Sequence, residues 1–247
     1  MEGSETRMGG SREAFPETVW FTQLSGDGPV TEERRAALDR FILRYWRPVY
    51  KYVRTAERAS VEDAKDRTQD FFHYLIEKGV LSRYDAAQGR LRHFLKGVLR
   101  NYLSEIRRAE GRQKRGGDRE ALSLDVSKIE TERFGRERDR CAPDELFDRQ
   151  WAEDLLSRAV AAVRRQLEGE GKSHFWNVYQ AYVLSPGPGP SPTYRDVARD
   201  LSLTPLQVQN SLQYVRSRLR ETVRAGIRES AGPFQDTDPE MSALLQP

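Results

Sequence analysis

Amide and guanidinium side chains gather near the C-terminal end of this sequence, in positions where they could contact DNA. Amide groups suit the edges of bases, and guanidinium groups suit phosphates. The spacing predicts that four amide residues and one serine face outward from one helix: Gln207, Gln209, Asn210, Gln213 and Ser211. Arg216, Arg218 and Arg220 follow them. The chemistry that this pattern indicates is recognition of duplex DNA.

Two short helices must position these side chains. Thr193 is predicted to cap the first, with Asp196 closing a capping box, and Thr204 the second, with Pro205 at its first position. The three residues 201–203 leave room only for a sharp turn. Apolar residues recur at helical spacing on both sides of it: Val197, Ala198, Leu201, Val208, Leu212, Val215 and Leu219. The segment predicts a helix-turn-helix whose second helix enters the major groove, although a helical hairpin with a solvated face fits the same pattern.

A second region that could bind a polyanion is the long amphipathic helix predicted over residues 89–108. Its apolar residues fall at steps of three and four from Leu91 to Ile106. The opposite face carries Arg90, Arg92, Lys96, Arg100, Asn101, Arg107 and Arg108, opposed only by Glu105 and Glu110. Solvated faces usually mix charges of both signs, so this segregation favours nucleic acid.

A third set of polar residues forms a stripe on a helix that is predicted to begin after Ser60, with Asp63 completing the cap. The stripe consists of Asp66, Gln69, Asp70 and His73, on the side away from Phe71, Phe72 and Leu75. Carboxylates on an exposed flank lack the burial that raises a carboxyl pKa for catalysis. A partner-binding surface or plain solvation is therefore favoured, and the residues alone do not separate these two.

Composition narrows the class of protein. The 247 residues include 32% charged residues with a formal net charge of only +3, so affinity for nucleic acid must come from local charge segregation. Cys141 is the only cysteine, and the three histidines have no metal-ligand spacing, so no metal and no cofactor are expected. Without a long apolar run or a signal-peptide core, the sequence predicts a cytoplasmic protein with no membrane insertion.

The pattern predicts an all-α chain of two small helical domains. These are residues 17–115 and 146–230, with tails at 1–16 and 231–247 and a flexible linker at 116–145 that mixes charges with few apolar anchors. Within the linker, residues 121–126 alternate in polarity and could form a short strand. Pro48 is expected to start or kink a helix. The first helix of the second domain is expected to bury Leu146, Phe147, Trp151, Leu155, Leu156, Ala159, Val160 and Val163.

These segments, in this order, resemble the extracytoplasmic-function group of the sigma-70 family of bacterial RNA polymerase sigma factors. Residues 62–72 (EDAKDRTQDFF) are similar to the family's core-binding motif, residues 89–108 to the helix that melts and reads the −10 element, and residues 194–220 to the module that reads the −35 element. The phrases YWRPVYKYVR, QKRGG and LSLD resemble a planctomycete-like subgroup. The resemblance covers about residues 19–228.

The resemblance implies a transcription initiation factor that does no covalent chemistry. It assigns binding of the clamp helices of core RNA polymerase to Asp66, Gln69, Asp70 and His73, and docking on the polymerase flap to the C-terminal module. It assigns −10 contacts to Tyr84, Arg90, Arg92, Lys96, Arg100, Asn101, Arg107 and Arg108, with residues 79–89 and Asn101 holding an unstacked base. It assigns −35 contacts to Thr204, Gln207, Gln209, Asn210, Ser211, Gln213, Tyr214 and Arg216. The linker would thread toward the polymerase active-site channel, and an anti-sigma protein, a regulatory kinase or the C-terminal tail would control the factor.

The sequence departs from the family pattern at a few positions. Arg67 makes the middle of the core-binding motif polar, Ser202 stands where the turn commonly has glycine, and Gln209 and Ser211 stand where basic residues are common. Two other classes stay open: a stand-alone helix-turn-helix regulator, which would be a dimer on two-fold sites, and an adaptor that binds only proteins. An enzyme is disfavoured, because the sequence shows no nucleophile–base set, phosphate loop or metal spacing.

Overall fold

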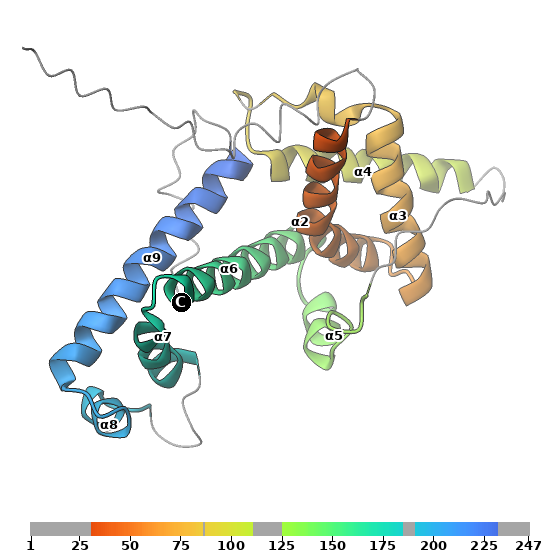
Figure 1. Cartoon of the computed structure of the whole chain (residues 1–247). Coiled ribbons are helices and arrows are strands. Elements are labelled where there is room, and N and C mark those ends of the chain that lie inside the picture. Colours follow the sequence, from red (N-terminus) through yellow and green to blue (C-terminus); the bar gives the residue numbers. More distant parts are fainter. Residues whose placement is uncertain (1–30, 86, 111–124, 185–190, 232–247) are drawn as a thin grey trace, which may run out of the picture.

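The computed structural model describes residues 31–85, 87–110, 125–184 and 191–231, and all regular structure within these ranges is helical (Figure 1). The all-α prediction is therefore confirmed. No helix within the described ranges is long and apolar enough to cross a membrane. The predicted tail 1–16, residues 232–247 and most of the 121–126 stretch proposed as a strand lie outside the described residues.

Helix α2 (Glu32–Ala56) forms the centre of the N-terminal half. The Thr31 side chain accepts a hydrogen bond from the Arg34 backbone N–H and begins the helix. Pro48 lies inside α2 and cannot donate the backbone hydrogen bond that continues the helical ladder. Figure 1 shows α2 changing direction along its length. Of the two alternatives predicted for Pro48, a helix start or a kink, the structure has the kink. The kink lets both arms of α2 bury aromatic side chains.

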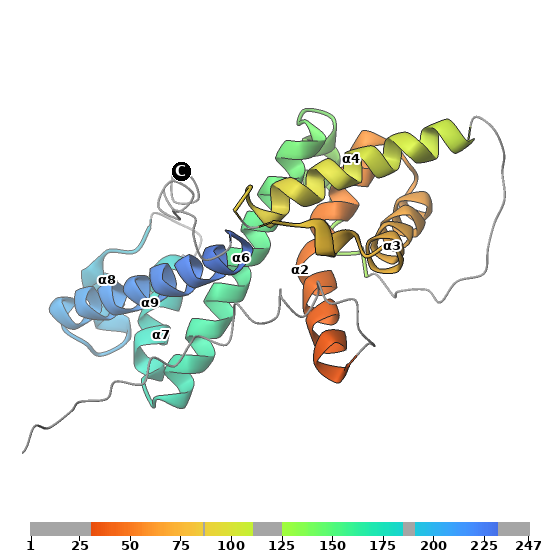
Figure 2. The ribbon, with the colours of Figure 1, turned by 90° about the horizontal axis from the view of Figure 1, so that it is seen from above.

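Helices α3 (Val61–Glu77) and α4 (Leu91–Glu110) pack on α2, with the short 3₁₀ helix η1 (Val80–Arg83) between them (Figure 2). Ser60 caps α3 as predicted, accepting from the Asp63 N–H at 3.1 Å. Phe72 meets Phe41 of α2 edge to face, with ring centroids 5.9 Å apart. The apolar stripe predicted for α4 is buried at Leu91, Leu95, Leu99, Tyr102 and Leu103.

The described part of the predicted linker is folded against the rest of the chain. Helix α5 (Glu132–Arg138) lies within it, and the side chains of Val126, Ile129 and Phe134 are buried in the same cluster as α2. These three apolar residues are the anchors that the linker prediction overlooked. Asp125 and Val126 are not in a strand.

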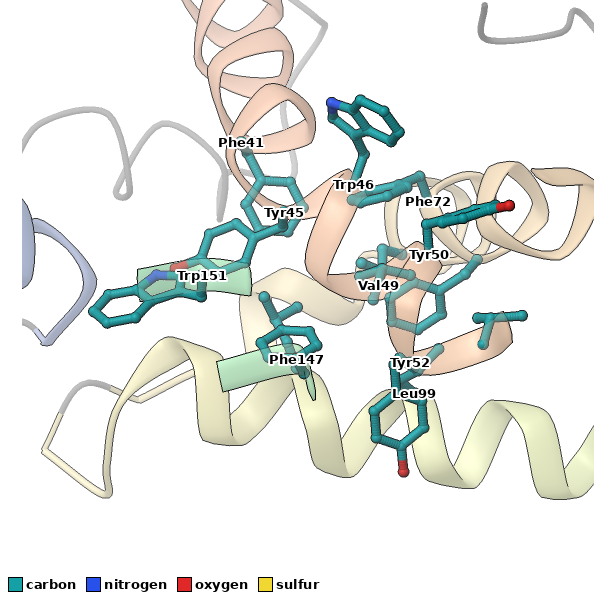
Figure 3. Close-up of a cluster of buried hydrophobic side chains, with 14 of the residues drawn as sticks. Phe41, Tyr45, Trp46, Val49, Tyr50, Tyr52, Phe72, Leu99, Phe147 and Trp151 are labelled. Carbon is teal, nitrogen blue, oxygen red and sulfur yellow. The ribbon is translucent and has the colours of Figure 1, made fainter. Parts of the chain in front are cut away.

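Helix α6 (Pro143–Gly169) joins two hydrophobic clusters. Its first half places Phe147 and Trp151 among residues of α2 and α4, and Figure 3 shows them in one group with Tyr45, Val49 and Leu99. Its second half supplies the other cluster with Val163 and Leu167. Leu156 was predicted on the buried face and is instead 36% exposed, because Leu155 takes the buried side of that turn.

The remaining helices complete the second cluster. Helix α7 (Ser173–Tyr179) continues into a π-helical turn, η2 (Gln180–Leu184), and helices α8 (Tyr194–Asp200) and α9 (Pro205–Ala231) follow. The end of α9 returns to the first cluster, where Val223 and Ile227 are buried. Both α6 and α9 therefore contribute to both clusters.

Gly226 marks the closest approach between α9 and α6. A Cβ atom at this position would overlap Leu155 Cδ1, whereas a Cβ at Gly97 of α4 would meet nothing within 4 Å. We expect Gly226→Val to lower the free energy of unfolding by about 1–3 kcal/mol through overpacking. The matched change Gly97→Val should alter it by less than about 0.5 kcal/mol. Urea denaturation of both variants tests this, and equal stabilities would contradict the predicted contact.

Candidate DNA-binding and partner-binding surfaces

Helices α8 and α9 form the helix-turn-helix that the sequence predicts. The Thr193 side chain accepts from the Asp196 N–H while the Asp196 carboxylate accepts from the Thr193 N–H at 3.0 Å, which completes the capping box. The turn is closed by the Leu203 N–H, which donates to the Ala198 carbonyl at 2.8 Å. The predicted apolar residues lie in the second cluster, most of them buried, with Leu201 and Leu219 partly buried. The two helices are thus locked into one rigid unit.

The start of α9 uses Gln207 for structure. The Thr204 N–H donates to the Gln207 Oε1 at 2.8 Å, and the Gln207 N–H donates to the Thr204 Oγ1 at 3.2 Å. This reciprocal pair is a second capping box, which the sequence signature Thr-x-x-Gln could have revealed. Both side chains, predicted as DNA contacts, hold the end of the helix in this structure.

The outward row of α9 is narrower than predicted. Gln209, Asn210, Gln213 and Arg216 are exposed, as the spacing indicated. Ser211 was predicted to face outward, and this was wrong: it is 4% exposed and its hydroxyl donates to the Gln207 carbonyl at 2.8 Å. The reason is helical phase, because position 211 is three residues from Val208 and one residue from Leu212 on the buried arc.

Two further side chains lie near this row: Leu206, for which the sequence made no prediction, and Tyr214, which was predicted to contact DNA. Leu206, which sequence reasoning passed over, is 65% exposed in the first turn of α9. Tyr214 is half-buried, and its hydroxyl is bonded by Lys172 at 3.0 Å and Arg218 at 3.1 Å. These two cations lower the pKa of the Tyr214 phenol by stabilising its charged form. Tyr214 thereby ties α9 to the loop before α7.

The basic face of α4 meets acidic residues of α6. Lys96 Nζ lies 2.6 Å from the Asp148 Oδ2, and Arg100 donates to both oxygens of Asp144 at 3.1 Å. Arg92 Nε lies 3.7 Å from Asp148 Oδ1. Three of the residues predicted to hold DNA phosphates are therefore paired within the chain. Counting charges along one helix could not find these partners, because they are more than forty residues away.

The rest of the predicted −10 surface is partly open. Asn101 and Arg108 are exposed, whereas Arg107 is bonded to the Glu57 carboxylate at 2.8 Å. Arg90 is half-buried and has interaction partners within the chain.

The predicted base-holding loop is closed on itself at one point. The Tyr84 hydroxyl donates to the Gly89 carbonyl at 2.8 Å, and its ring packs on Phe94 with centroids 5.5 Å apart. Burial raises the pKa of the Tyr84 phenol. Tyr84 thus braces the loop against α4.

The acidic stripe of α3 faces away from the core, as the spacing predicted. Asp66 is exposed, and Gln69, Asp70 and His73 are half-buried, each of these three with an interaction inside the chain. The opposite face of α3 buries Phe71, Phe72 and Leu75. One turn beyond His73, Ile76 is 39% exposed and extends the stripe with an apolar side chain.

A cleft of about 330 Å³ lies between α2, α5 and α6. Lys51 lines it, with its ammonium 3.9 Å from the Glu153 carboxylate and 5.2 Å from the centre of the Phe134 ring. Burial lowers the pKa of Lys51 and raises the pKa of the nearby Asp154. No pattern in the sequence indicates this cleft, because the residues of α5 are predicted to belong to the linker. Among the described residues, no three His, Cys, Asp or Glu side chains are grouped to hold a metal ion.

Comparison with known proteins assigns no family to the chain: no protein-family model, curated protein or solved structure matches it.

Ser202 has a backbone φ of +55°, in the left-handed region that favours glycine. We expect Ser202→Gly to raise the free energy of unfolding by about 0.5–1 kcal/mol. Glycine adopts a positive φ without steric cost, so the change would relieve backbone strain in the turn between α8 and α9. The same change within α9, Ser217→Gly, should lower it by about 0.5 kcal/mol, since glycine is a poor helix former. Thermal denaturation of both variants checks the opposite signs, and destabilisation by both would contradict the strain at Ser202.

Proposed function

We propose that this protein is a transcription initiation factor that binds bacterial core RNA polymerase and directs it to −35 and −10 promoter elements. The observation that carries the proposal is the exposed row Gln209, Asn210, Gln213 and Arg216 on a helix that is capped and fixed in a helix-turn-helix. Amide side chains in such a row can read base edges in the major groove, and the arginine can hold a phosphate. The −35 element is the assigned target.

A sigma factor needs a second surface for the polymerase, and the stripe on α3 suits this role. Asp66 offers a solvated charge, and Ile76 adds an exposed apolar side chain on the same face. An apolar contact surrounded by polar groups is typical of a protein interface. By resemblance, the partner is the clamp of the largest polymerase subunit.

Helix α4 supplies the proposed −10 surface. Its arginines and Lys96 are spaced along one face, where they can hold the phosphates of a separated strand. Unstacking a base costs a few kcal/mol, which contacts to the backbone and to a base pocket would offset. The factor would position polymerase and separate strands without being an enzyme, and it would act in the cytoplasm under an anti-sigma protein or a regulatory kinase.

A stand-alone helix-turn-helix regulator is the second candidate. It is favoured by the ion pairing of Arg92, Lys96 and Arg100, which leaves α9 as a more accessible DNA-facing helix than α4. Such a regulator would bind palindromic duplex DNA as a dimer without polymerase. Sedimentation of the free protein with duplex DNA, compared with run-off transcription by core polymerase on a pool of random templates, separates the two functions.

Charge reversal on α3 tests polymerase binding. Asp66→Lys with Asp70→Lys should abolish capture of core polymerase by the tagged protein, because repulsion would replace attraction on a surface that lies outside the core. The matched control is Glu33→Lys with Asp39→Lys, which makes the same charge change on exposed positions of α2. Circular dichroism should show equal helix content in both. Wild-type capture of polymerase by the α3 variant would show that the stripe is not the binding surface.

Alanine substitutions on α9 test DNA readout. Gln209→Ala, Asn210→Ala and Gln213→Ala should each change the selected −35 sequence, since a lost bidentate base contact reduces discrimination by roughly 1–3 kcal/mol. Ser211→Ala should leave the preference unchanged, because Ser211 is buried. Leu212→Asp should unfold the module by burying a charge. Sequencing of DNA selected from a random library measures the preference. If all the alanine variants select the same sequence as the wild type, these residues of α9 do not read the bases.

A further inference from the structure

We propose that α6 closes the DNA-binding face of α4, with the carboxylates of Asp144 and Asp148 occupying the positions that DNA phosphates would take. This inference rests on the proposed function for the role of α4, but the closed contact itself is a feature of this chain. Core polymerase would then act as the partner that withdraws α6 and frees the basic face.

The two helices present matching ladders of charge. Arg92, Lys96 and Arg100 follow one another at intervals of four residues, one per turn of α4. Asp144 and Asp148 have the same spacing at the start of α6. Lys96 reaches both carboxylates, at 2.6 Å to Asp148 and 3.9 Å to Asp144. Guanidinium and ammonium groups bind carboxylate and phosphate oxygens with the same geometry, so one ladder cannot hold both ligands at once.

Two of the three cations of this ladder, Lys96 and Arg92, are covered, whereas the Arg100 side chain is 61% exposed. The side chain of Lys96 is 11% exposed and that of Arg92 is 14% exposed. The Arg92 guanidinium also lies 4.6 Å from the centre of the Trp151 ring, which belongs to α6. The phosphates of a DNA strand could not reach either cation unless the first turns of α6 moved away.

Apolar packing and ion pairs both hold α6 against the basic face of α4. Phe147 and Trp151 are buried against α2 and α4, and they fix where α6 lies in the free chain. The ion pairs determine which cations are covered. The exposed pair of Arg100 with Asp144 is weak and screened by salt, whereas the covered pairs of Lys96 and Arg92 are screened less. Such a contact can be displaced by a partner that binds the open state better, so the closed arrangement is a two-state element.

Neutralising the two carboxylates provides the test. Asp144→Asn with Asp148→Asn removes the two carboxylates that stand in for phosphates. The control, Glu145→Gln with Glu168→Gln, removes the same charge from α6, and these glutamates pair with Arg149 and Arg164 of the same helix. Binding of the free full-length proteins to a fluorescein-labelled single-stranded 30-mer of mixed sequence is measured by anisotropy over a series of salt concentrations. We expect the aspartate variant to bind more tightly than both wild type and the control. Its log–log salt slope should be steeper by about 0.7 for each cation that becomes accessible, which amounts to about 2 when all three are reached.

The outcomes separate clearly. Equal affinity and slope for the aspartate variant and its control would overturn the inference. If the double variant loses helix content, the single change Asp144→Asn, at a side chain 41% exposed, should free Arg100 and steepen the slope by about 0.7. An unchanged slope there also contradicts closure. Failure of the proposed function would show separately, as wild-type protein that supports no transcription by core polymerase, and would leave this comparison of free proteins intact.

Discussion

The burial of α6 between the two hydrophobic clusters is the constraint on which the rest of this structure depends. Its first half carries Phe147 and Trp151 into the aromatic core of α2, and its second half carries Val163 and Leu167 into the core of the helix-turn-helix. Helix α9 follows α6 so closely that any side chain at position 226 would displace Leu155. An ion pair between Arg44 and Glu229 joins the far end of α9 to α2. The proposed −35 and −10 surfaces are thereby held in one fixed relation in the free chain.

The local distribution of charge, rather than the net charge, determines what each surface of this fold can bind. With a net charge of +3, the chain has almost as many acidic as basic residues, and their placement decides what each surface can bind. Where α6 crosses α4, acidic and basic ladders cancel each other. On α9, the Arg216 side chain and the amides beside it are exposed and available to a ligand. Under the proposed function, the protein would present one DNA-reading helix, α9, while it keeps the other, α4, covered, which suits a factor that should engage a promoter only together with polymerase.

Local signals in the sequence predicted the local structure well. The caps at Thr193, Thr204 and Ser60 and the apolar spacing of α4 and α9 depend on residues within one or two turns, so the helices could be placed from the sequence. What could not be predicted depends on contacts between distant residues. Ser211 was misplaced because its phase lies at the edge of the buried arc. Helix α5 was missed because Phe134 is buried in a cluster made mostly of residues that are distant in the sequence. The partners of Lys96 were invisible for the same reason.

The central claim is that promoter DNA is opened only when this protein and core polymerase act together, and permanganate reactivity tests it most directly. Permanganate oxidises unpaired thymines, so a duplex promoter selected from a random pool reports strand separation at each position. The account predicts reactive thymines in one short segment upstream of the start site when both proteins are present, and none with either alone. Tight binding of duplex DNA by the free protein, with no reactive thymines after polymerase is added, would contradict the account.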